Sequence, residues 1–431
     1  MTTVDRPGGG GRGGGLGRGG GDPGDGVRAA LEERFRSSHA RIVAALTRRF
    51  GARHFALVEQ AVQEAYVRAL GQWTVHGLPD DAERWLVRVA HNAAVDALRR
   101  ERSHLTLERA HDVSEADPPA FDAEDEVRLM FLCCDPSLSR AAQIALVANV
   151  AFGLTAAQIA TAFVSDERTV AQRLVRAKQR LRERGVQFDV PAAGALPERL
   201  AALLDVLYVV FAEGYSPSVG EEAIDDGLCR EALRFVRLLT SRDDTGSPAA
   251  FALHALLCFH AARAPARLAD DGSLLLLAEQ DRTRWDRALM DEAFGCLCRA
   301  GTGAELTRYH LEAGIAACHA AAPSYAATDW GRVVEMYAVL RARWPSLVVD
   351  INHALAVAMY AGTRAGLDEL DAIPERDVLA RYPYALAAYA DLHASLGNLD
   401  EARHYLDRAI ARQPAAAQAA LLRRKRAALD R

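Results

Sequence analysis

The chain lacks the features that mark membrane-spanning, exported and disulfide-stapled proteins. No run of about eighteen apolar residues could cross a bilayer, and no signal-peptide pattern occurs, so we expect no membrane association. The seven cysteines are scattered without the spacing of a disulfide framework, which predicts reduced thiols and a cytoplasmic protein. Alternation of apolar and polar residues is scarce, so no strand is predicted.

Apolar residues are plentiful and recur at helical spacing. They make up 50% of the 431 residues, enough to bury the cores of two or three domains. Alanine, leucine and arginine dominate, and an all-α fold is therefore predicted. The net charge of −5 argues against binding nucleic acid over the whole surface, but a local basic patch would suffice for a DNA contact.

The stretch from Thr155 to Arg184 predicts a helix-turn-helix. Thr155 and Gln158 have the spacing of a capping box, which opens a short first helix. The second helix has an apolar stripe of Val170, Leu174, Ala177 and Leu181. Its opposite stripe is polar and basic, and consists of Thr169, Gln172, Arg173, Arg176 and Arg180. Such a helix could enter a major groove, and the alternative is an ordinary solvated helix rich in arginine.

A second helix with a possible nucleic-acid face is predicted from Trp85 to Arg100, after a loop between Gly71 and Glu83. One face carries an aromatic ring, an amide and cations, in Trp85, Arg88, Asn92 and Arg99. Aromatic and amide side chains suit unpaired bases, which stack and expose their edges. The alternative is that Trp85 belongs to the core and the arginines are merely on the surface.

Changes of composition divide the chain into five parts. A glycine-rich tail, predicted to be disordered, covers 1–26, and a first helical block covers 27–102. An acidic linker at 103–125 leads to a second block at 126–188, whose first helix is expected to begin at Val127. A third helical part covers 192–431. Within the first block, Gly51 separates two helices, and Gln60, Gln63 and Glu64 form a polar face that could dock a basic partner helix.

The end of the chain matches the pattern of a tetratricopeptide repeat. The matching small, large and proline positions are Leu386, Tyr389, Ala390, Gly397, Ala402, Leu406, Ala409 and Pro414. Stacked repeats leave a concave groove that commonly takes a peptide or a helix. The third helical part also contains five side chains of types that bind metals, namely Cys296, Cys298, Cys318, His310 and His319. Their spacing fits no zinc site, so we expect no metal and no cofactor.

Three stretches together resemble bacterial sigma factors of the extracytoplasmic-function type. They are 62–70 (VQEAYVRAL), 85–100 (WLVRVAHNAAVDALRR) and 169–178 (TVAQRLVRAK). Segments 129–139 and 211–215 look like the subgroup with a long, tetratricopeptide-like C-terminal extension. The resemblance implies sigma domain 2 at 27–102, sigma domain 4 at 126–188, and a repeat domain that modulates activity.

The resemblance also implies roles for individual residues. Gln63 and Glu64 would meet the clamp helices of the largest polymerase subunit, although Gln60 stands where the family usually has an acidic residue. The −10 element would be bound by Trp85, Arg88, Asn92, Arg99 and Arg100, with the loop from His76 to Asp81 holding an extruded base. The −35 element would be bound by Arg168, Thr169, Gln172, Arg173 and Arg176.

The function expected from this resemblance is promoter recognition and transcription initiation, without enzymatic activity. The expected partners are core RNA polymerase, through its clamp helices and the flap of its second-largest subunit, and promoter DNA. Because members of the subgroup often lie beside genes for small YCII-related proteins, such a protein is a candidate partner of the repeat domain. The alternative is a helix-turn-helix regulator with a helical-repeat sensor, which would need only the second block. An enzyme built on the C-terminal helices has no supporting set of residues.

Overall fold

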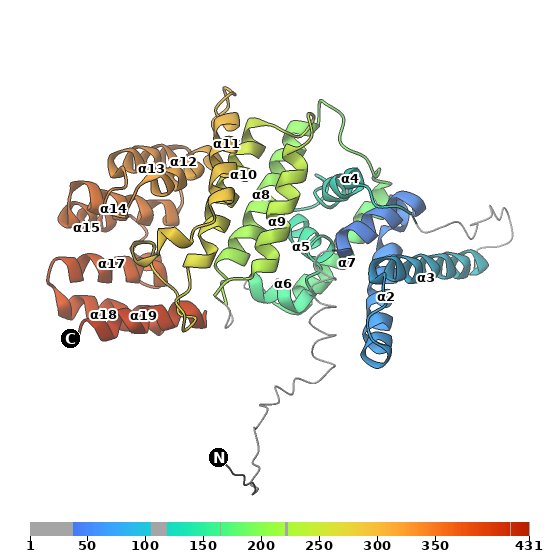
Figure 1. Ribbon diagram of the computed structural model, residues 1–431, viewed down its shortest axis with the longest axis horizontal. Helices are drawn as coiled ribbons and strands as arrows, with labels where there is room; N and C mark the ends of the chain where they lie inside the picture. The colour runs from blue at the N-terminus through green and yellow to red at the C-terminus, as the bar shows by residue number, and fades with distance from the viewer. Residues whose placement is uncertain (1–37, 105–118, 164, 220–222, 414, 431) are drawn as a thin grey trace, which may run out of the picture.

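The computed structural model describes residues 38–104, 119–163, 165–219, 223–413 and 415–430. These residues fold as helices without a strand, and one isolated bridge joins Leu268 to Leu274. The predicted all-α class is confirmed. Figure 1 shows the N-terminal helices at one end of the molecule and α13–α19 at the other. The predicted glycine-rich tail lies outside the described residues.

The first block consists of a helix over 38–50, η1 (Ala52–His54), α2 (Phe55–His76) and α3 (Ala82–His104). Gly51 separates the first two with a φ of 88°, as its position predicted. The loop predicted between Gly71 and Glu83 is present but shorter, over 77–81, because α2 continues through Gly71 to His76 and α3 begins at Ala82. A glycine inside a helix costs only about 1 kcal/mol, which burial of Trp73 one half-turn later can offset.

The second block consists of α4 (Ala123–Cys133), α5 (Arg140–Val150), α6 (Ala156–Ala162) and α7 (Glu167–Arg184). The expected start of α4 at Val127 was wrong, because the Asp122 carboxylate caps the helix by accepting from the Glu124 backbone N–H. Helices α6 and α7 form the predicted helix-turn-helix. The capping box of Thr155 and Gln158 is present.

The third part begins with α8 (Leu196–Tyr215), α9 (Asp226–Thr240), α10 (Pro248–Arg263), α11 (Arg287–Ala300) and α12 (Arg308–Ala321). Three short helices lie between α10 and α11, namely η2 (Ala264–Ala266), η3 (Leu277–Glu279) and η4 (Arg282–Arg284). One apolar core runs from Ala40 in the first block through Phe131 and Phe152 to Ala313 in α12. The three parts inferred from composition therefore share a core up to α12.

The C-terminal helices are α13 (Trp330–Arg343), α14 (Leu347–Ala361), α15 (Thr363–Asp371), α16 (Arg376–Leu379), α17 (Pro383–Ser395), α18 (Leu399–Ile410) and α19 (Ala416–Ala428). They bury smaller clusters of their own, and Leu386 of α17 packs with Leu406 and Ala409 of α18. This pair lies where the repeat pattern was found, while Pro414 falls outside the described residues. That these helices form tetratricopeptide repeats stays a prediction. Among the described helices, none is long and apolar enough to cross a membrane.

Candidate nucleic-acid and polymerase interface

Helix α7 presents the polar face that its sequence predicted. Val170, Leu174, Ala177 and Leu181 are its buried residues, in agreement with the predicted apolar stripe. Of the residues assigned to duplex contact, Arg168, Thr169, Gln172 and Arg176 are exposed and Arg173 is half-buried. The Asp166 carboxylate caps the helix, accepting the Thr169 backbone N–H at 2.9 Å and lying 3.2 Å from the Thr169 hydroxyl. Thr169 is thus partly engaged in capping, whereas the arginines extend from the helix surface.

Helix α3 presents a second polar face. Arg88, Asn92, Arg99 and Arg100 are all exposed, as expected. Trp85 is half-buried and packs edge-on against Trp73, with 5.3 Å between ring centroids. Trp85 was interpreted either as a ring that stacks on unpaired bases or as a core residue. One part of the ring packs in the core and another part stays accessible, so each interpretation describes part of the side chain.

The two residues predicted to contact polymerase lie on the surface of α2. Gln63 and Glu64 are both exposed, and each interacts with a neighbour one turn away. The Gln63 amide donates to Glu59 Oε1 at 3.1 Å, and Glu64 pairs with Arg68 at 2.5 Å. The exposed pair of Glu64 and Arg68 contributes little, about 0–1 kcal/mol, so a partner helix can compete for Glu64.

Helices α2 and α7 are joined by an ion pair that the sequence analysis did not identify. The buried Glu59 carboxylate, on a side chain that is 3% exposed, binds the Lys178 ammonium of α7. Lys178 also donates to Asn149 Oδ1 at 3.2 Å, and the Asn149 amide donates to the Leu154 carbonyl at 2.9 Å. Glu59 follows the buried Val58, and a buried carboxylate requires a cation partner. This neighbour is the signal in the sequence that Glu59 forms an ion pair, but it does not indicate which cation is the partner.

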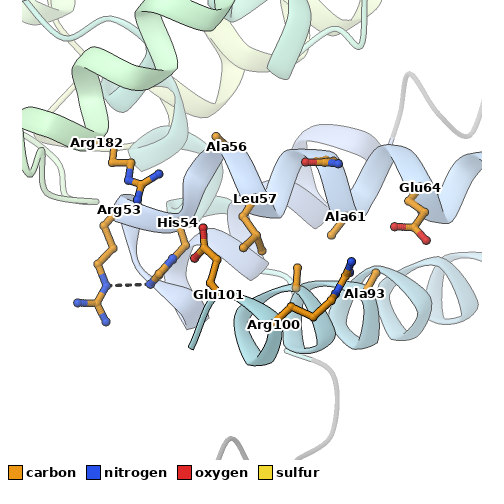
Figure 2. Close-up of a pocket in the computed structure, with 12 residues that line it drawn as sticks. Arg53, His54, Ala56, Leu57, Ala61, Glu64, Ala93, Arg100, Glu101 and Arg182 are labelled. Atoms are coloured by element: carbon orange, nitrogen blue, oxygen red, sulfur yellow. Dashed lines mark hydrogen bonds between the residues drawn. The ribbon is translucent and has the colours of Figure 1, made fainter. Parts of the chain in front are cut away.

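A groove of about 510 Å³ lies beside this contact and is lined by residues of η1, α2, α3 and α7 (Figure 2). Gln60 and Glu64 of α2 line it, together with Arg100 of α3 and Arg182 of α7. Arg182 lies at the end of the groove near Ala56, whereas Glu64 lies toward its other end (Figure 2). The end of α7 therefore lies beside the start of α2 and leaves Gln63 and Glu64 exposed.

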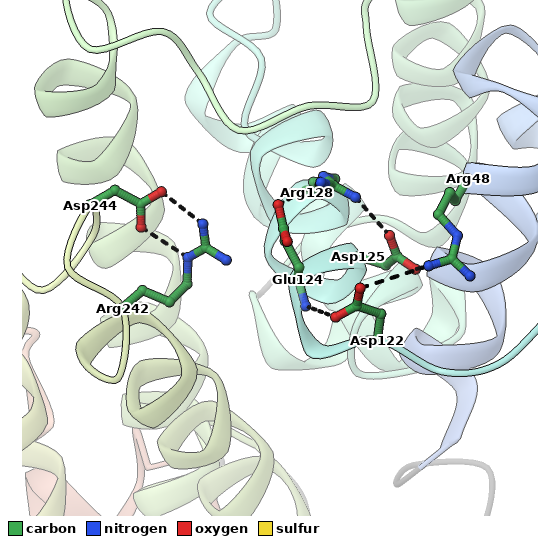
Figure 3. A network of polar contacts seen from close by, with 7 residues as sticks. All are labelled: Arg48, Asp122, Glu124, Asp125, Arg128, Arg242 and Asp244. Carbon is green, nitrogen blue, oxygen red and sulfur yellow. Dashed lines mark hydrogen bonds and ion pairs between the residues drawn. The ribbon is translucent and has the colours of Figure 1, made fainter.

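A polar network fastens α4 to the first helix (Figure 3). The Asp125 side chain is fully buried and binds Arg48 at 2.8 Å and Arg128 at 3.1 Å. Burial raises the pKa of Asp125, while Arg48 acts in the opposite direction. Breaking such a pair would leave an uncompensated charge, so the network fixes the position of α4. Arg242 and Asp244, at the other side of Figure 3, pair at 2.7 Å after α9.

Helices α8 and α9 hold the second block from the other side. Arg234 of α9 pairs with the buried Glu126 of α4 at 2.7 Å. Arg140 of α5 pairs with Asp205 of α8 at 3.3 Å, and Arg199 of α8 donates to the Phe131 carbonyl of α4. The third part of the chain is therefore attached directly to the helix-turn-helix block.

Comparisons with known proteins identify two parts of the chain. Residues 35–104 match the model of sigma-70 region 2, and residues 199–301 match a family of unknown function, DUF6596. The uncharacterized protein R00370 of Rhizobium meliloti is 36% identical over 397 residues, which cover 90% of this chain and 93% of that protein. The probable ECF RNA polymerase sigma factor SigI, from two strains of Mycobacterium tuberculosis, is 33% identical over 147 residues. That match covers 32% of this chain and 50% of SigI. No solved structure matches the chain.

Proposed function

The chain belongs to the family of the Rhizobium meliloti protein R00370 and has a sigma-70 region 2 domain, and from this premise we propose that it is an alternative-type sigma factor. It binds core RNA polymerase, recognises −35 and −10 promoter elements, and promotes initiation without an enzymatic step of its own. The region 2 domain and the similarity to SigI support the sigma-type role in initiation. The contacts with individual elements are the finer part of the proposal.

The observation that carries the proposal is the order of two exposed polar faces along the chain. The face of α3 lies inside the region 2 match, and the face of α7 follows in a capped helix-turn-helix. In the proposed mechanism, α7 binds paired DNA through base edges and phosphates. The Asn92 amide and the accessible part of Trp85 on α3 hold a strand that has separated. Their contacts offset the few kcal/mol that unstacking a base costs.

Promoter binding by this mechanism requires α7 to leave α2. The two elements are named for positions about 25 base pairs apart, which is roughly 85 Å of straight duplex at about 3.4 Å per base pair. Lys178 of α7 binds Glu59 of α2 directly, so one closed chain cannot reach both elements. We therefore infer that binding to polymerase separates α7 from α2.

The C-terminal part is proposed to modulate this activity through α8 and α9. Arg234 and Arg199 hold α4, so a ligand or protein on the third part can change the freedom of the helix-turn-helix block. A small YCII-related protein is the proposed partner, and the cytoplasm the proposed location. Because the core continues from the first block into α12, this role is best tested in the full chain with Arg234→Met.

A helix-turn-helix regulator is the second candidate, favoured by the complete α6–α7 unit. Binding to core polymerase separates the two hypotheses. A sigma factor forms a one-to-one complex with core enzyme and competes with its resident specificity subunit, as measured by fluorescence anisotropy of the labelled chain. Gln63→Ala together with Glu64→Ala should weaken the complex, while Glu401→Ala on the distant α18 should not. Binding to DNA without any affinity for core enzyme would instead identify a regulator.

A further inference from the structure

Helices α10 and α11 bring two pairs of metal-binding side chains together, inside the region that matches the family of unknown function. His254 and Cys258 lie one helical turn apart on α10, and Glu292 and Cys296 lie one turn apart on α11. Residues four apart in a helix share a face, so each helix directs both of its side chains toward the other. Donor atoms of His254, Cys258 and Glu292 lie within 4.8 Å of one another. Among the described residues, this is the one such group of three.

Two of the three side chains of this group are buried. His254 is 5% exposed and Cys258 is fully buried. Cys296 is also buried, and its Sγ lies 3.3 Å from His254 Nδ1. The Glu292 side chain is 31% exposed, so the group reaches solvent on that side. Imidazole, thiol and carboxylate together are a donor combination that proteins use to hold a metal.

The hydrogen bonds around His254 suit a metal ligand. His254 Nε2 lies 2.8 Å from Glu292 Oε1, and Nδ1 lies 2.9 Å from the Thr240 hydroxyl. Without metal, the 2.8 Å contact is a hydrogen bond from Nε2–H to the Glu292 carboxylate. With metal, the ring proton moves to Nδ1, where the Thr240 hydroxyl oxygen can accept it because that hydroxyl donates to the Val236 carbonyl at 3.0 Å, and Nε2 is then free to bind the ion. A second partner that fixes the ring in this way is typical of metal-bound histidine.

We propose that His254, Cys258 and Glu292 bind one Zn²⁺ ion, independently of the proposed function. Nitrogen, sulfur and oxygen donors together favour zinc, which is borderline-soft and prefers four ligands. Cys296 Sγ lies at Nδ1, on the other side of the imidazole ring from Nε2, so water takes the fourth position. On binding, the Cys258 S–H bond breaks, its proton leaves to solvent, and the sulfur electron pair forms the Zn–S bond.

The charges around the site agree with this assignment. Arg237 of α9 holds Glu292 with two bonds, Nε to Oε1 at 2.7 Å and Nη2 to Oε2 at 2.6 Å. The Arg237 guanidinium lowers the pKa of Glu292, so the carboxylate is ionised without metal. Zn²⁺ with Arg237 gives three positive charges, and Glu292 with the Cys258 thiolate gives two negative charges. The site keeps one net positive charge beside the partly exposed Glu292 side chain, and it would join α9, α10 and α11.

The sequence predicted no metal, because its closely spaced cysteines and histidines fit no zinc pattern. Of those side chains, Cys296 lies beside the proposed site, at Nδ1 of His254, whereas Cys298 is exposed. His310 instead lies against Thr307, with 2.8 Å between Nδ1 and the hydroxyl oxygen. The proposed ligands come from two helices separated by a long connection that includes η2, η3 and η4.

The test uses the full chain, reduced, stripped of metal with EDTA and then titrated with zinc alone. We expect one zinc per chain by mass spectrometry of the dialysed protein, about one proton released per zinc by calorimetry in two buffers, and a higher Tm with zinc. Replacing zinc with cobalt should give the near-ultraviolet absorption band of a sulfur-to-cobalt bond. Cys258→Ser and Glu292→Gln should weaken zinc binding by more than the roughly 10–100-fold that loss of an outer partner costs.

Cys298→Ser is the matched control, since this exposed thiol lies on the same helix as Glu292 and should keep both the zinc and the cobalt band. Far-ultraviolet circular dichroism without metal checks that each variant folds. If Cys258→Ser fails to fold, the cobalt spectrum of the unaltered chain still decides. Wild-type protein that takes up no zinc, or whose cobalt form has no sulfur band, would overturn the proposal and leave a purely structural Arg–Glu–His network.

Discussion

Loss of the ion pair between Glu59 and Lys178 should change the affinity for core polymerase. The affinity should rise if α7 must separate from α2 on binding, and should not change if the pair is only a stabilising contact of the core. In Glu59→Gln the carboxylate is lost, while Lys178 keeps its bond to Asn149 and 18% exposure of its side chain. Breaking a buried pair costs about 3–5 kcal/mol, and this partial solvent access favours the lower end, about 3 kcal/mol. At about 1.4 kcal/mol per tenfold, the closed form loses roughly 100-fold relative to the open form.

The expected result is that Glu59→Gln binds core polymerase more tightly, by up to that factor of roughly 100, because less of the binding energy is used to open the chain. Opening is measured without polymerase by energy transfer between dyes on Gln72→Cys of α2 and Gln187→Cys after α7, in a Cys298→Ser chain. Glu183→Gln, an exposed change on α7, is the control and should leave both quantities unchanged. A lower Tm with unchanged energy transfer and unchanged polymerase affinity would refute the reasoning.

Three further predictions concern the two DNA faces and one histidine. Asn92→Ala should abolish permanganate reactivity of promoter thymines near −10 while footprinting still shows the −35 contact, and thymines that stay reactive would count against the role of α3. Arg173→Ala should weaken binding to a −35 duplex by about 1–3 kcal/mol in anisotropy titrations if the guanidinium makes a bidentate base contact, so an unchanged Kd would remove it from base recognition. Burial lowers the pKa of His260 from 6.5 to about 3. Between these two values the imidazole is protonated in the unfolded chain and neutral in the folded chain. The contribution of His260 to the free energy of unfolding is therefore fully present above pH 6.5 and is lost as pH falls toward 3, with a loss of about 2 kcal/mol at pH 5. In urea titrations at pH 7.5 and 5, His260→Phe should reduce the difference in the free energy of unfolding between the two pH values. An unchanged difference would contradict this role of His260.

Local patterns predicted the helix-turn-helix well because caps and helix faces depend on neighbours within a turn or two. Thr155 and Gln158 form the expected capping box, and Val170 and Leu174 are buried on the expected stripe. The same reasoning misplaced the loop at Gly71, where burial of Trp73 outweighs a weak local preference.

Contacts between distant segments could not be predicted in this way. Nothing near Glu59 in the sequence identifies Lys178 as its partner, and nothing near His254 indicates that Glu292 faces it. Composition likewise suggested separate parts, whereas the structure has one core from the first block to α12. The faces of α3 and α7 were predicted as exposed surfaces, which is confirmed except at the half-buried Trp85 and Arg173. Contact with DNA depends on a partner and stays a prediction.

The most direct test of the central claim is run-off transcription on fragmented genomic DNA with core polymerase and the purified full chain. We predict transcripts that core enzyme alone does not make, with start sites that share one element near −35 and another near −10. Sequencing of the transcripts identifies both elements directly, whatever the promoter sequence. Transcripts no different from those of core enzyme alone, under conditions in which another specificity subunit is active, would contradict the account.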